Sequence, residues 1–574
     1  MPQASAIFDR IHAKLIRVYG PNQGDSAYQR LCDIIGNPTE GAGSVLPVSE
    51  RDIMLITYGD QVKRGGENPL HTLRNFLDQT LASTINNVHI LPFYPYSSDD
   101  GFSVIDYRAV NPQLGNWDDI VALSTDYGLM FDAVFNHISA KSEWFQAFLR
   151  GESPYKDYFV TADPDIDLSA VVRPRALPLL TPFLTPDGEK HVWTTFSDDQ
   201  IDLNAANPDV LLELVDILLF YVQQGARFIR LDAIAFLWKV AGTSCIHLEE
   251  THLIIQLMRD VLDLVAPHVV LITETNVPHE ENISYFGDDT NEAQMVYQFP
   301  LPPLILHTFR TGDTTALTRW AGTIHRVSER TTFFNFTASH DGIGLRPVTG
   351  ILTDGEIQAL VQLAQDHGGY VSYKTNSDSS QSPYELNITY FDAITNPAIT
   401  RQSADIACQR FICSQAMMLA FIGVPGVYFH SLYGSRNFDA GVAETGRYRT
   451  INREKLDADA VLKGLEDSGT IRSKVYHAYT HLLDIRKQEP AFHPLGQQRV
   501  LNLDSRVFAL ERMYDDARII ALHNVTGEAF DLELQVGDSR WNDRVHNTNH
   551  QTITDKLRLQ LAPYQVAWLA EIVE

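Results

Sequence analysis

Three carboxylates and a histidine, Asp232, Glu274, Asp341 and His137, each stand at or just beyond the end of a short apolar segment. These segments have the length and composition of buried strands. Charged groups should not follow a buried strand unless they meet a partner there. In a parallel α/β protein, the carboxyl ends of the strands share one face, where catalytic groups gather. Four such endings in one chain therefore predict a barrel whose catalytic mouth is built around carboxylates.

The segment Gly225–Ala233 shows this pattern most clearly. Gly225 ends a helical stretch with the left-handed cap that glycine favours, and an apolar strand follows. Arg230 and Asp232 are two residues apart, so both side chains lie on the same side of that strand. A structural ion pair that closes the strand would explain this spacing equally well. The recurrence of polar strand ends elsewhere in the chain favours a catalytic role.

The elements that must position these groups are predicted from apolar spacing. Segments of strand length recur up to about residue 430 and are separated by stretches of helical periodicity. The expected barrel strands lie at 52–58, 88–93, 129–137, 228–231, 269–274, 293–299, 331–336 and 426–430. From about Gln498 the apolar period changes to two, which predicts an antiparallel β domain at the end of the chain.

The composition excludes several classes of protein. The chain has 574 residues, 44% of them hydrophobic, and a formal net charge of −27 that is spread along the sequence. Such a charge disfavours nucleic acid as a partner. No apolar run is long enough for a membrane span, and the N-terminus lacks the features of a secretory signal. The four cysteines lack metal-ligand spacing, so we expect buried thiols and a cytoplasmic location.

Two arginine-bearing segments indicate an anionic ligand. Arg173 and Arg175 lie two apart in a stretch that prolines keep extended, and guanidinium groups match the geometry of phosphate. Four further arginines lie close together later in the chain: Arg436, Arg447, Arg449 and Arg453. The alternatives are that the first two are solvated at the surface and that the later four pair with nearby acids.

Two polar segments have the composition of sugar-binding loops. Tyr94–Phe102 combines aromatic rings with acids, which suits the C–H faces and the hydroxyls of a sugar. Asp99 in this segment could instead close an Asx turn. Tyr370–Glu385 is polar and rich in turn residues, so we expect a binding loop that ends in Tyr384 and Glu385.

The four strand ends resemble the conserved regions of the α-amylase family of retaining glycosidases, and the likeness extends from about Asp52 to Glu454. The resemblance implies that Asp232 is the nucleophile, Glu274 the general acid/base and Asp341 the carboxylate that stabilises the transition state. It implies that the sugar in the donor subsite is held by Asp99, His137, Arg230 and His340.

Retaining chemistry sets two further expectations for these acids. The nucleophile and the acid/base of a retaining glycosidase lie about 5–5.5 Å apart. Arg230 should favour the ionised form of Asp232, since an opposite charge nearby stabilises a carboxylate. Glu274 should have a raised pKa, so that it holds a proton near neutrality.

The resemblance also implies the domain organisation. The expected fold is α/β, a (β/α)8 TIM barrel with inserted B and B′ subdomains and a C-terminal antiparallel β domain. A helical extension would occupy residues 1–50, the B insert 138–204, the B′ loop-rich insert 342–404 and the β domain 496–574. The catalytic barrel would comprise residues 51–137, 205–341 and 405–495.

A finer resemblance concerns the group that accepts the sugar. Asp99–Phe102, the segment around Arg173 and Arg175, and Arg449–Arg453 look like the sucrose phosphorylase subfamily. In that subfamily an arginine matching Arg449 helps the residue matching Asp99 to hold glucose, and residues of the B domain and the loops bind phosphate. The product would be α-D-glucose 1-phosphate.

The chain departs from sucrose phosphorylases in the loop that faces the acceptor, where Ser382–Glu385 stands in place of an Asp-Leu-Tyr-Gln run. Arg173–Leu180 and Tyr428–Asn437 resemble instead the branch of glucosylglycerate and sucrose 6-phosphate phosphorylases. Within it, the sequence is most similar to glucosylglycerate phosphorylases. This implies reversible phosphorolysis of 2-O-α-D-glucosyl-D-glycerate, with Tyr384, Glu385 and Arg436 near an anionic acceptor.

Three alternatives stay open from the sequence. The same chemistry could use sucrose, sucrose 6-phosphate or glucosylglycerol; the enzyme could be an α-glucoside hydrolase or transglucosidase; or the chain could be a sugar-binding relative, although such a relative should lack the carboxylates. We expect small-molecule partners (an α-glucoside, phosphate and glycerate), no nucleic acid, no membrane, and a monomer or homodimer. No cofactor or metal is expected, since the phosphorylase branch generally dispenses with the calcium that Asn136 could ligate.

Overall fold

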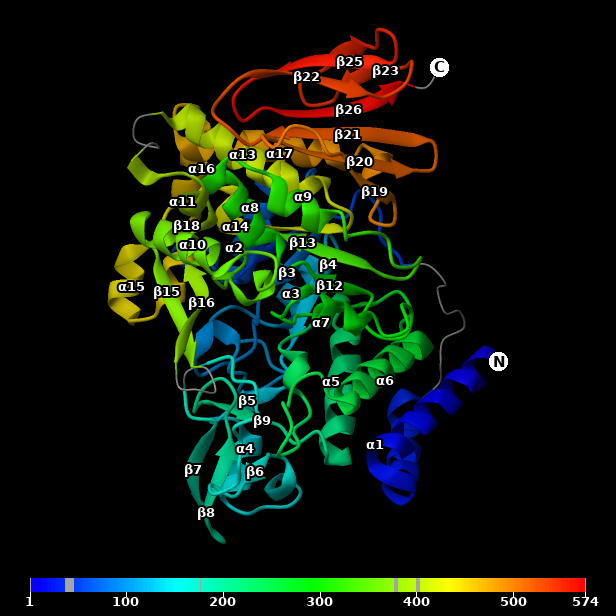
Figure 1. Ribbon diagram of the computed structural model, residues 1–574. Helices are drawn as coiled ribbons and strands as arrows, with labels where there is room; N and C mark the ends of the chain where they lie inside the picture. Colours follow the sequence, from blue (N-terminus) through cyan, green and yellow to red (C-terminus); the bar gives the residue numbers. More distant parts are fainter. Residues whose placement is uncertain (1, 37–45, 176, 376–379, 399–402, 573–574) are drawn as a thin grey trace.

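A closed barrel of parallel strands forms the centre of the molecule (Figure 1). The computed structural model describes residues 2–36, 46–175, 177–375, 380–398 and 403–572. Within these ranges, the eight barrel strands run in the spatial order β1-β17-β13-β12-β11-β10-β4-β3. They are β1 (Met54–Thr57), β3 (Asn87–Ile90), β4 (Gly128–Ala133), β10 (Ala226–Leu231), β11 (Val270–Thr273), β12 (Met295–Tyr297), β13 (Thr332–Phe336) and β17 (Val424–Tyr428). The predicted barrel is confirmed, and the carboxyl ends of its strands define one face.

The segment around Gly225 is built as the sequence predicts. Helix α5 (Pro208–Gln223) begins at the N-cap Asn207, whose side chain accepts a hydrogen bond from the backbone N–H of Asp209. Pro208 fits the first turn because backbone N–H groups have no acceptor within the helix there, so the N–H that proline lacks is not needed. Gly225 has a φ of 94°, which glycine adopts without strain, so β10 can start directly after the helix.

Two predicted strands end earlier than expected. The run 129–137 is not one strand, because β4 stops at Ala133 and His137 begins β5 (His137–Ser139). β5 pairs antiparallel with β9 (Gln200–Asp202), which draws the chain away from the barrel. Similarly, β17 ends at Tyr428, and the next residues form the short helix α14 (Phe429–Leu432).

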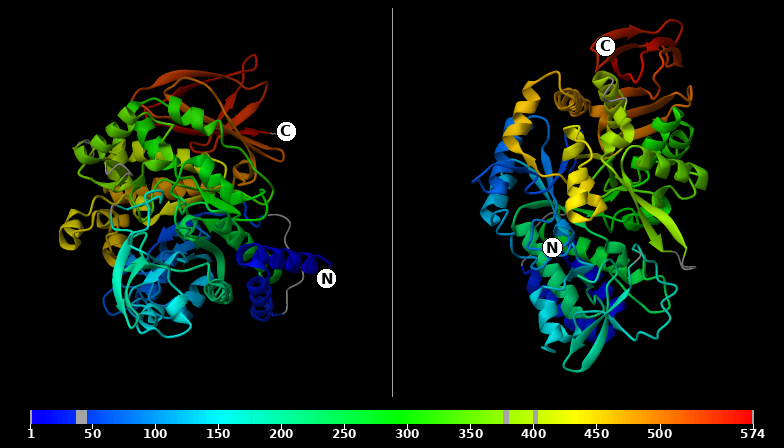
Figure 2. Two further views of the ribbon diagram at one scale, coloured as in Figure 1. Left: turned by 60° about the horizontal axis from the view of Figure 1, so that its bottom comes forward. Right: turned by 90° about the vertical axis from the view of Figure 1, so that its left-hand side faces the viewer.

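The insert after β4 lies at the end of the molecule opposite the C-terminal sheet (Figures 1 and 2). It holds a helix and a small antiparallel sheet in the order β6-β8-β7. These elements are α4 (Glu143–Leu149), β6 (Thr161–Ala162), β7 (Leu180–Thr185) and β8 (Gly188–Trp193). Arg173 and Arg175, the arginines predicted to bind phosphate, precede β7 and therefore belong to this insert.

The insert after β13 contains a hairpin where the sequence predicts an irregular loop. Strands β15 (Tyr370–Thr375) and β16 (Gln381–Asn387) pair antiparallel, and β14 (Ile343–Gly344) adds to the other edge of β16. The loop prediction is wrong for these strands, because pairing on both edges and the burial of Leu386 outweigh their polar composition. The insert also holds the helices α10 (Asp354–Asp366) and α11 (Tyr390–Ile394).

The two ends of the chain pack on different sides of the barrel (Figure 2). Helix α1 (Pro2–Ile35) lies against α5 and α6 (Glu249–Val265), where Arg10 and Lys14 contact Asp260 at 2.6 and 2.5 Å.

At the other end, an antiparallel sheet in the order β19-β20-β21-β26-β23-β24 covers α13 (Ala404–Ala420). Its strands are β19 (Gln497–Val500), β20 (Val507–Tyr514), β21 (Ala517–Asn524), β23 (Arg540–Asp543), β24 (Thr548–Gln551) and β26 (Val566–Ile572). The predicted C-terminal β domain is confirmed.

The element order supports the domain limits predicted above, and we propose those limits as the domain boundaries. Among the helices that the structure describes, none combines the length and the apolar character that a membrane span requires.

Candidate active site

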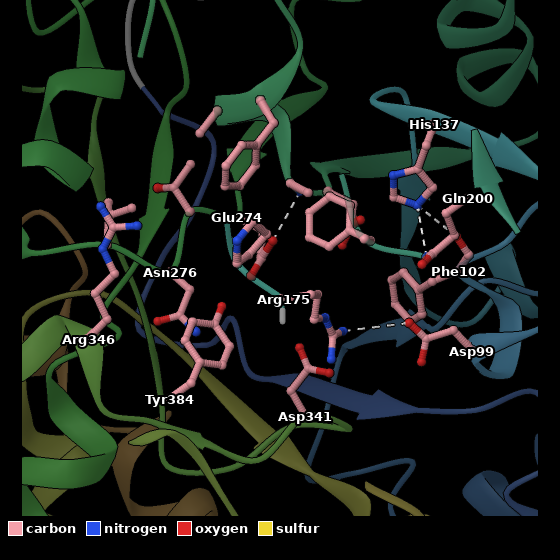
Figure 3. A pocket seen from close by; sticks show the side chains of 18 of the residues that line it. Asp99, Phe102, His137, Arg175, Gln200, Glu274, Asn276, Asp341, Arg346 and Tyr384 are labelled. Carbon is pink, nitrogen blue, oxygen red and sulfur yellow. Dashed lines mark hydrogen bonds and ion pairs between the residues drawn. The ribbon is translucent and has the colours of Figure 1, made fainter. Parts of the chain in front are cut away.

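A pocket at the carboxyl ends of the barrel strands gathers most of the predicted site residues (Figure 3). Its lining includes the three predicted catalytic acids together with histidines, arginines and a tyrosine. From the predicted set these are Asp99, His137, Arg175, Asp232, Glu274, His340, Asp341, Tyr384 and Arg449. The convergence of residues from such distant parts of the chain is what the barrel face makes possible.

The acids Asp232 and Glu274 are placed side by side by neighbouring strands. β10 pairs in parallel with β11, and the Glu274 N–H donates to the Leu231 carbonyl at 3.1 Å. Just beyond the strand, the N–H of Ala233 donates to Oε2 of Glu274 at 3.1 Å. Both carboxyls therefore sit on fixed backbone at one edge of the barrel, which is the requirement for precise chemistry.

One buried guanidinium connects the two acids. Arg230 donates through Nη1 to Asp232 at 2.8 Å, and its Nη2 lies 3.8 Å from Glu274. Below the site, Asp132 of β4 accepts from the same Nη1 and lies 2.7 Å from the Nε2 atom of His89. Asp132 was missed by the sequence reasoning, although it lies within the predicted strand 129–137, five positions before its end.

Burial sets the protonation of the central pair. It raises the pKa of Asp232 well above its usual value, against the pull of Arg230, and it also raises the pKa of Glu274. The two carboxyls therefore titrate as a coupled pair that holds a proton to higher pH than ordinary carboxyls do. Because Arg230 is about 1 Å nearer to Asp232, the negative charge is favoured there and the proton on Glu274.

Asp341 lies in a different electrostatic environment. Burial would raise its pKa, but Arg449, His340 and Arg453 together hold that pKa below the usual value. Arg453 Nη2 is 3.5 Å from the carboxylate, and Arg449 makes a closer ion pair. Asp341 therefore stays ionised, beside a pair of acids that shares a proton.

His137 and His340, two of the predicted donor-subsite residues, also line this pocket. His137 donates through Nε2 to the Phe102 carbonyl at 2.9 Å, and burial lowers its pKa, so the ring is neutral. His340 stacks on the ring of Phe102 with centroids 4.6 Å apart. Gln200, which contacts His137 and lines the pocket, gave no recognisable sequence signal because it arrives from the insert.

Arg449 lines the same pocket as Asp99 and pairs with two other acids. It donates to both carboxylate oxygens of Glu385, at 3.0 and 2.6 Å, and pairs with Asp341. Asp99 lies instead near Arg453, at 3.7 Å, and Arg175, at 4.0 Å. Glu385 is buried beneath the pocket and holds Arg449 in position.

Two of the arginines predicted to bind phosphate or the acceptor lie outside the residues that line this pocket. Arg436 pairs with Asp392, and its guanidinium lies 5.8 Å from the centroid of the Phe391 ring. Arg173 donates to the Leu177 carbonyl within its own segment. For both side chains the structure favours the alternative of local partners, whereas Arg175 faces the pocket.

Asn136, the residue that could have ligated calcium, is hydrogen-bonded to a lysine. Asn136 Oδ1 accepts from Lys239 Nζ at 2.8 Å, and the same ammonium lies 2.7 Å from Asp202. The positive charge that these oxygens require is thus supplied by the protein, and the residues do not fit a bound cation. Within the described ranges, His, Cys, Asp and Glu form no group of three or more that could hold a metal ion.

We expect Asp132→Asn to lower the free energy of unfolding by about 2–3 kcal/mol at pH 7, because His89 and Arg230 hold the ionised form of Asp132 and its lowered pKa corresponds to that stabilisation. Asp132 has a pKa of about 2 in the folded chain, below the value of about 3.9 in an unfolded chain. Its contribution is therefore complete above pH about 4 and is lost as the pH falls to about 2. Urea unfolding across this pH range, with exposed Asp118→Asn as the control, measures both effects. Equal stability of the two variants at pH 7 would contradict the expectation.

Three comparisons relate this architecture to known proteins. The model of the family described as "Alpha amylase, catalytic domain" matches residues 79–354, a range that contains Asp232, Glu274 and Asp341. A glucosylglycerate phosphorylase of Allomeiothermus silvanus is 50% identical over 91% of this chain and 92% of its own length. A second one, from Spirochaeta thermophila, is 47% identical over 98% of each chain.

A solved structure shows the same fold. The crystal structure of sucrose 6F-phosphate phosphorylase from Thermoanaerobacter thermosaccharolyticum superposes with a TM-score of 0.72 and covers 84% of this chain and 96% of its own. Its sequence identity is 24%, so this similarity speaks for the fold alone.

Proposed function

This chain belongs to the α-amylase family, and we propose that it is a retaining disaccharide phosphorylase. The reaction would be the reversible phosphorolysis of 2-O-α-D-glucosyl-D-glycerate to α-D-glucose 1-phosphate and D-glycerate. The observation that carries the proposal is the gathering of three acids and anion-binding arginines in one pocket of a chain half identical to a glucosylglycerate phosphorylase.

In the first step, a carboxylate oxygen of Asp232 attacks the anomeric carbon of the glucosyl unit. The bond from that carbon to the glycerate oxygen breaks, and Glu274 gives its proton to the departing oxygen. The ring carbon becomes positively charged in the transition state, where the ionised Asp341 stabilises it. The product is a covalent glucosyl-enzyme, with inverted configuration at the anomeric carbon.

In the second step, an oxygen of phosphate attacks the same carbon and displaces Asp232. Glu274, now ionised, takes the proton from the attacking phosphate oxygen and returns to its starting form. Two inversions give net retention, so the product is the α-anomer of glucose 1-phosphate. The raised pKa of Glu274 supports both of its duties, because a higher pKa favours the protonated form that the first step needs and makes the carboxylate a better base in the second.

Arg175 is the best-placed partner for phosphate. It lines the catalytic pocket and a second pocket that also contains Arg447, Arg449 and Arg453, and its nearest carboxylate is 4.0 Å away, on Asp99. A guanidinium without a close counter-ion can bind a phosphate through paired hydrogen bonds.

We expect Arg175→Met to raise the KM for phosphate by about tenfold or more, because the charge-assisted hydrogen bonds between the guanidinium and phosphate would be lost. The matched control is Arg173→Met, which removes a neighbouring arginine that does not line the pocket. Initial rates of glucose 1-phosphate formation at varied phosphate concentration measure the effect. An equal change in both variants would argue against a phosphate role for Arg175.

The proposed function is tested with the native enzyme and four acceptors. α-D-glucose 1-phosphate is incubated with D-glycerate, fructose, fructose 6-phosphate or glycerol, and phosphate release is followed. We expect rapid release with D-glycerate. Release only with fructose or fructose 6-phosphate would instead indicate a sucrose or sucrose 6-phosphate phosphorylase. Equal release without any acceptor would indicate a hydrolase.

A further inference from the structure

The pocket has two ends, separated by the proposed acid/base (Figure 3). His137, Gln200 and Asp99 lie on one side of Glu274, and Asn276, Tyr384 and Arg346 lie on the other. The bond that breaks must lie at the acid/base, because the proton passes to its oxygen. If the first end holds glucose, the acceptor occupies the second.

Arg346 is the cation at the acceptor end. It lies between Leu345, the residue after β14, and Pro347. The backbone N–H of Leu345 donates to the Tyr384 carbonyl at 3.0 Å, which fixes the backbone before Arg346 against the hairpin. Its side chain is 20% exposed. Among the described residues, the guanidinium makes a single hydrogen bond, from Nη2 to Glu281 at 3.2 Å.

The surroundings of Arg346 leave positive charge for a ligand. Glu281 is shared with His247, whose Nε2 lies 3.2 Å from the same carboxylate oxygen. Lys374 is a second cation near Arg346, because its pKa is lowered first by burial and then by the positive charge of Arg346. Within the described ranges no carboxylate lies within ion-pair distance of Lys374. A second anion would therefore be favoured here.

Asn276 presents an unused amide beside this arginine. Its Oδ1 atom is buried, and in the described part of the chain it has no hydrogen-bond partner. Gly344 lies behind it, where an added Cβ would come within 2.8 Å of Oδ1. Buried polar atoms without partners are rare in folded proteins and indicate a ligand group that completes them.

We propose that Arg346 binds the carboxylate of the acceptor and thereby selects an acidic acceptor over a neutral polyol, while Asn276 accepts a hydrogen bond from an acceptor hydroxyl. The inference rests on the proposed function, and it leaves phosphate to Arg175, which lines the same pocket. A guanidinium and a carboxylate match through two parallel hydrogen bonds. The Asn276 Oδ1 atom can accept a hydrogen bond from a hydroxyl of the same molecule.

The test uses α-D-glucosyl fluoride as the donor, so that the glucosyl-enzyme forms without a phosphate group. Glycerate, glycerol and phosphate are then offered separately to the native enzyme, Arg346→Met and Arg346→Lys, and each glucosylated product is quantified. We expect Arg346→Met to raise the KM for D-glycerate by about tenfold or more. Transfer to glycerol and to phosphate should be unchanged, and Arg346→Lys should recover part of the glycerate affinity.

Arg436→Met is the matched control, since it removes an arginine that lies outside the pocket, and it should resemble the native enzyme. Unchanged glycerate affinity in Arg346→Met would overturn the assignment. So would an equal loss with glycerate, glycerol and phosphate, which would mark a structural role. If the native enzyme forms no glucosylglycerate, the proposed function itself fails, whatever the variants do.

Discussion

Replacing Asp232 with Asn should lower the rate of phosphorolysis by on the order of 10⁴- to 10⁶-fold, the loss found when a catalytic nucleophile is removed. The amide has nearly the shape of the carboxylate but cannot form the covalent glucosyl-enzyme. Without that intermediate neither half of the reaction can proceed, in either direction. Initial rates of glucose 1-phosphate formation from glucosylglycerate, and of phosphate release in reverse, measure the loss.

The fold should survive this change. Arg230 keeps Asp132 as a charged partner after Asp232 becomes neutral, so no buried charge is left alone. Thermal unfolding and circular dichroism check this point, and Asp216→Asn, on an exposed residue of α5, is the control. Substantial activity in a folded Asp232→Asn variant would remove Asp232 from the nucleophile's role.

Replacing Glu274 with Gln should give a loss that depends on the leaving group. With glucosylglycerate the rate should fall by about 10²- to 10⁴-fold, the contribution typical of general acid catalysis. With α-D-glucosyl fluoride the formation of the glucosyl-enzyme should be nearly unchanged, because fluoride departs without needing a proton. Rapid-mixing measurements of the first turnover with both donors separate the two cases.

The pH dependence offers a second readout of Glu274. Its pKa is raised by burial, so the acid form persists to higher pH than in an ordinary glutamic acid and is lost as the pH rises through that pKa. The native rate with glucosylglycerate should therefore fall at alkaline pH, and the variant should lack that fall. Glu280→Gln, at an exposed residue of the next helix, α7 (His279–Ile283), is the control. An equal loss with both donors would assign Glu274 a role other than proton transfer.

The sequence was most informative where side chains follow buried strands. Asp232, Glu274 and Asp341 could be located because an apolar run of strand length that ends in a carboxylate is unusual, and parallel strands bring their ends together. The same reasoning placed His137 at the site, although it belongs to β5 and not to the barrel strand before it.

The sequence was least informative for side chains that arrive from the inserts. Arg436 and Arg449 look alike in sequence, yet one pairs with Asp392 away from the pocket and the other pairs with Asp341 inside it. Gln200 and Arg346 reach the pocket only because the insert after β4 and the hairpin β15–β16 fold over the barrel face. The positions of these side chains depend on tertiary contacts, which the local apolar periodicity of the sequence does not predict.

The most direct measurement is the identification of the residue that carries the sugar. Glu274→Gln is mixed with α-D-glucosyl fluoride, so that the glucosyl-enzyme forms but turns over slowly, and the digested protein is analysed by mass spectrometry. The account predicts one added glucosyl unit on the peptide that contains Asp232, removed again when phosphate is supplied. A glucosyl unit on another peptide, or product formation with no adduct at all, would contradict it.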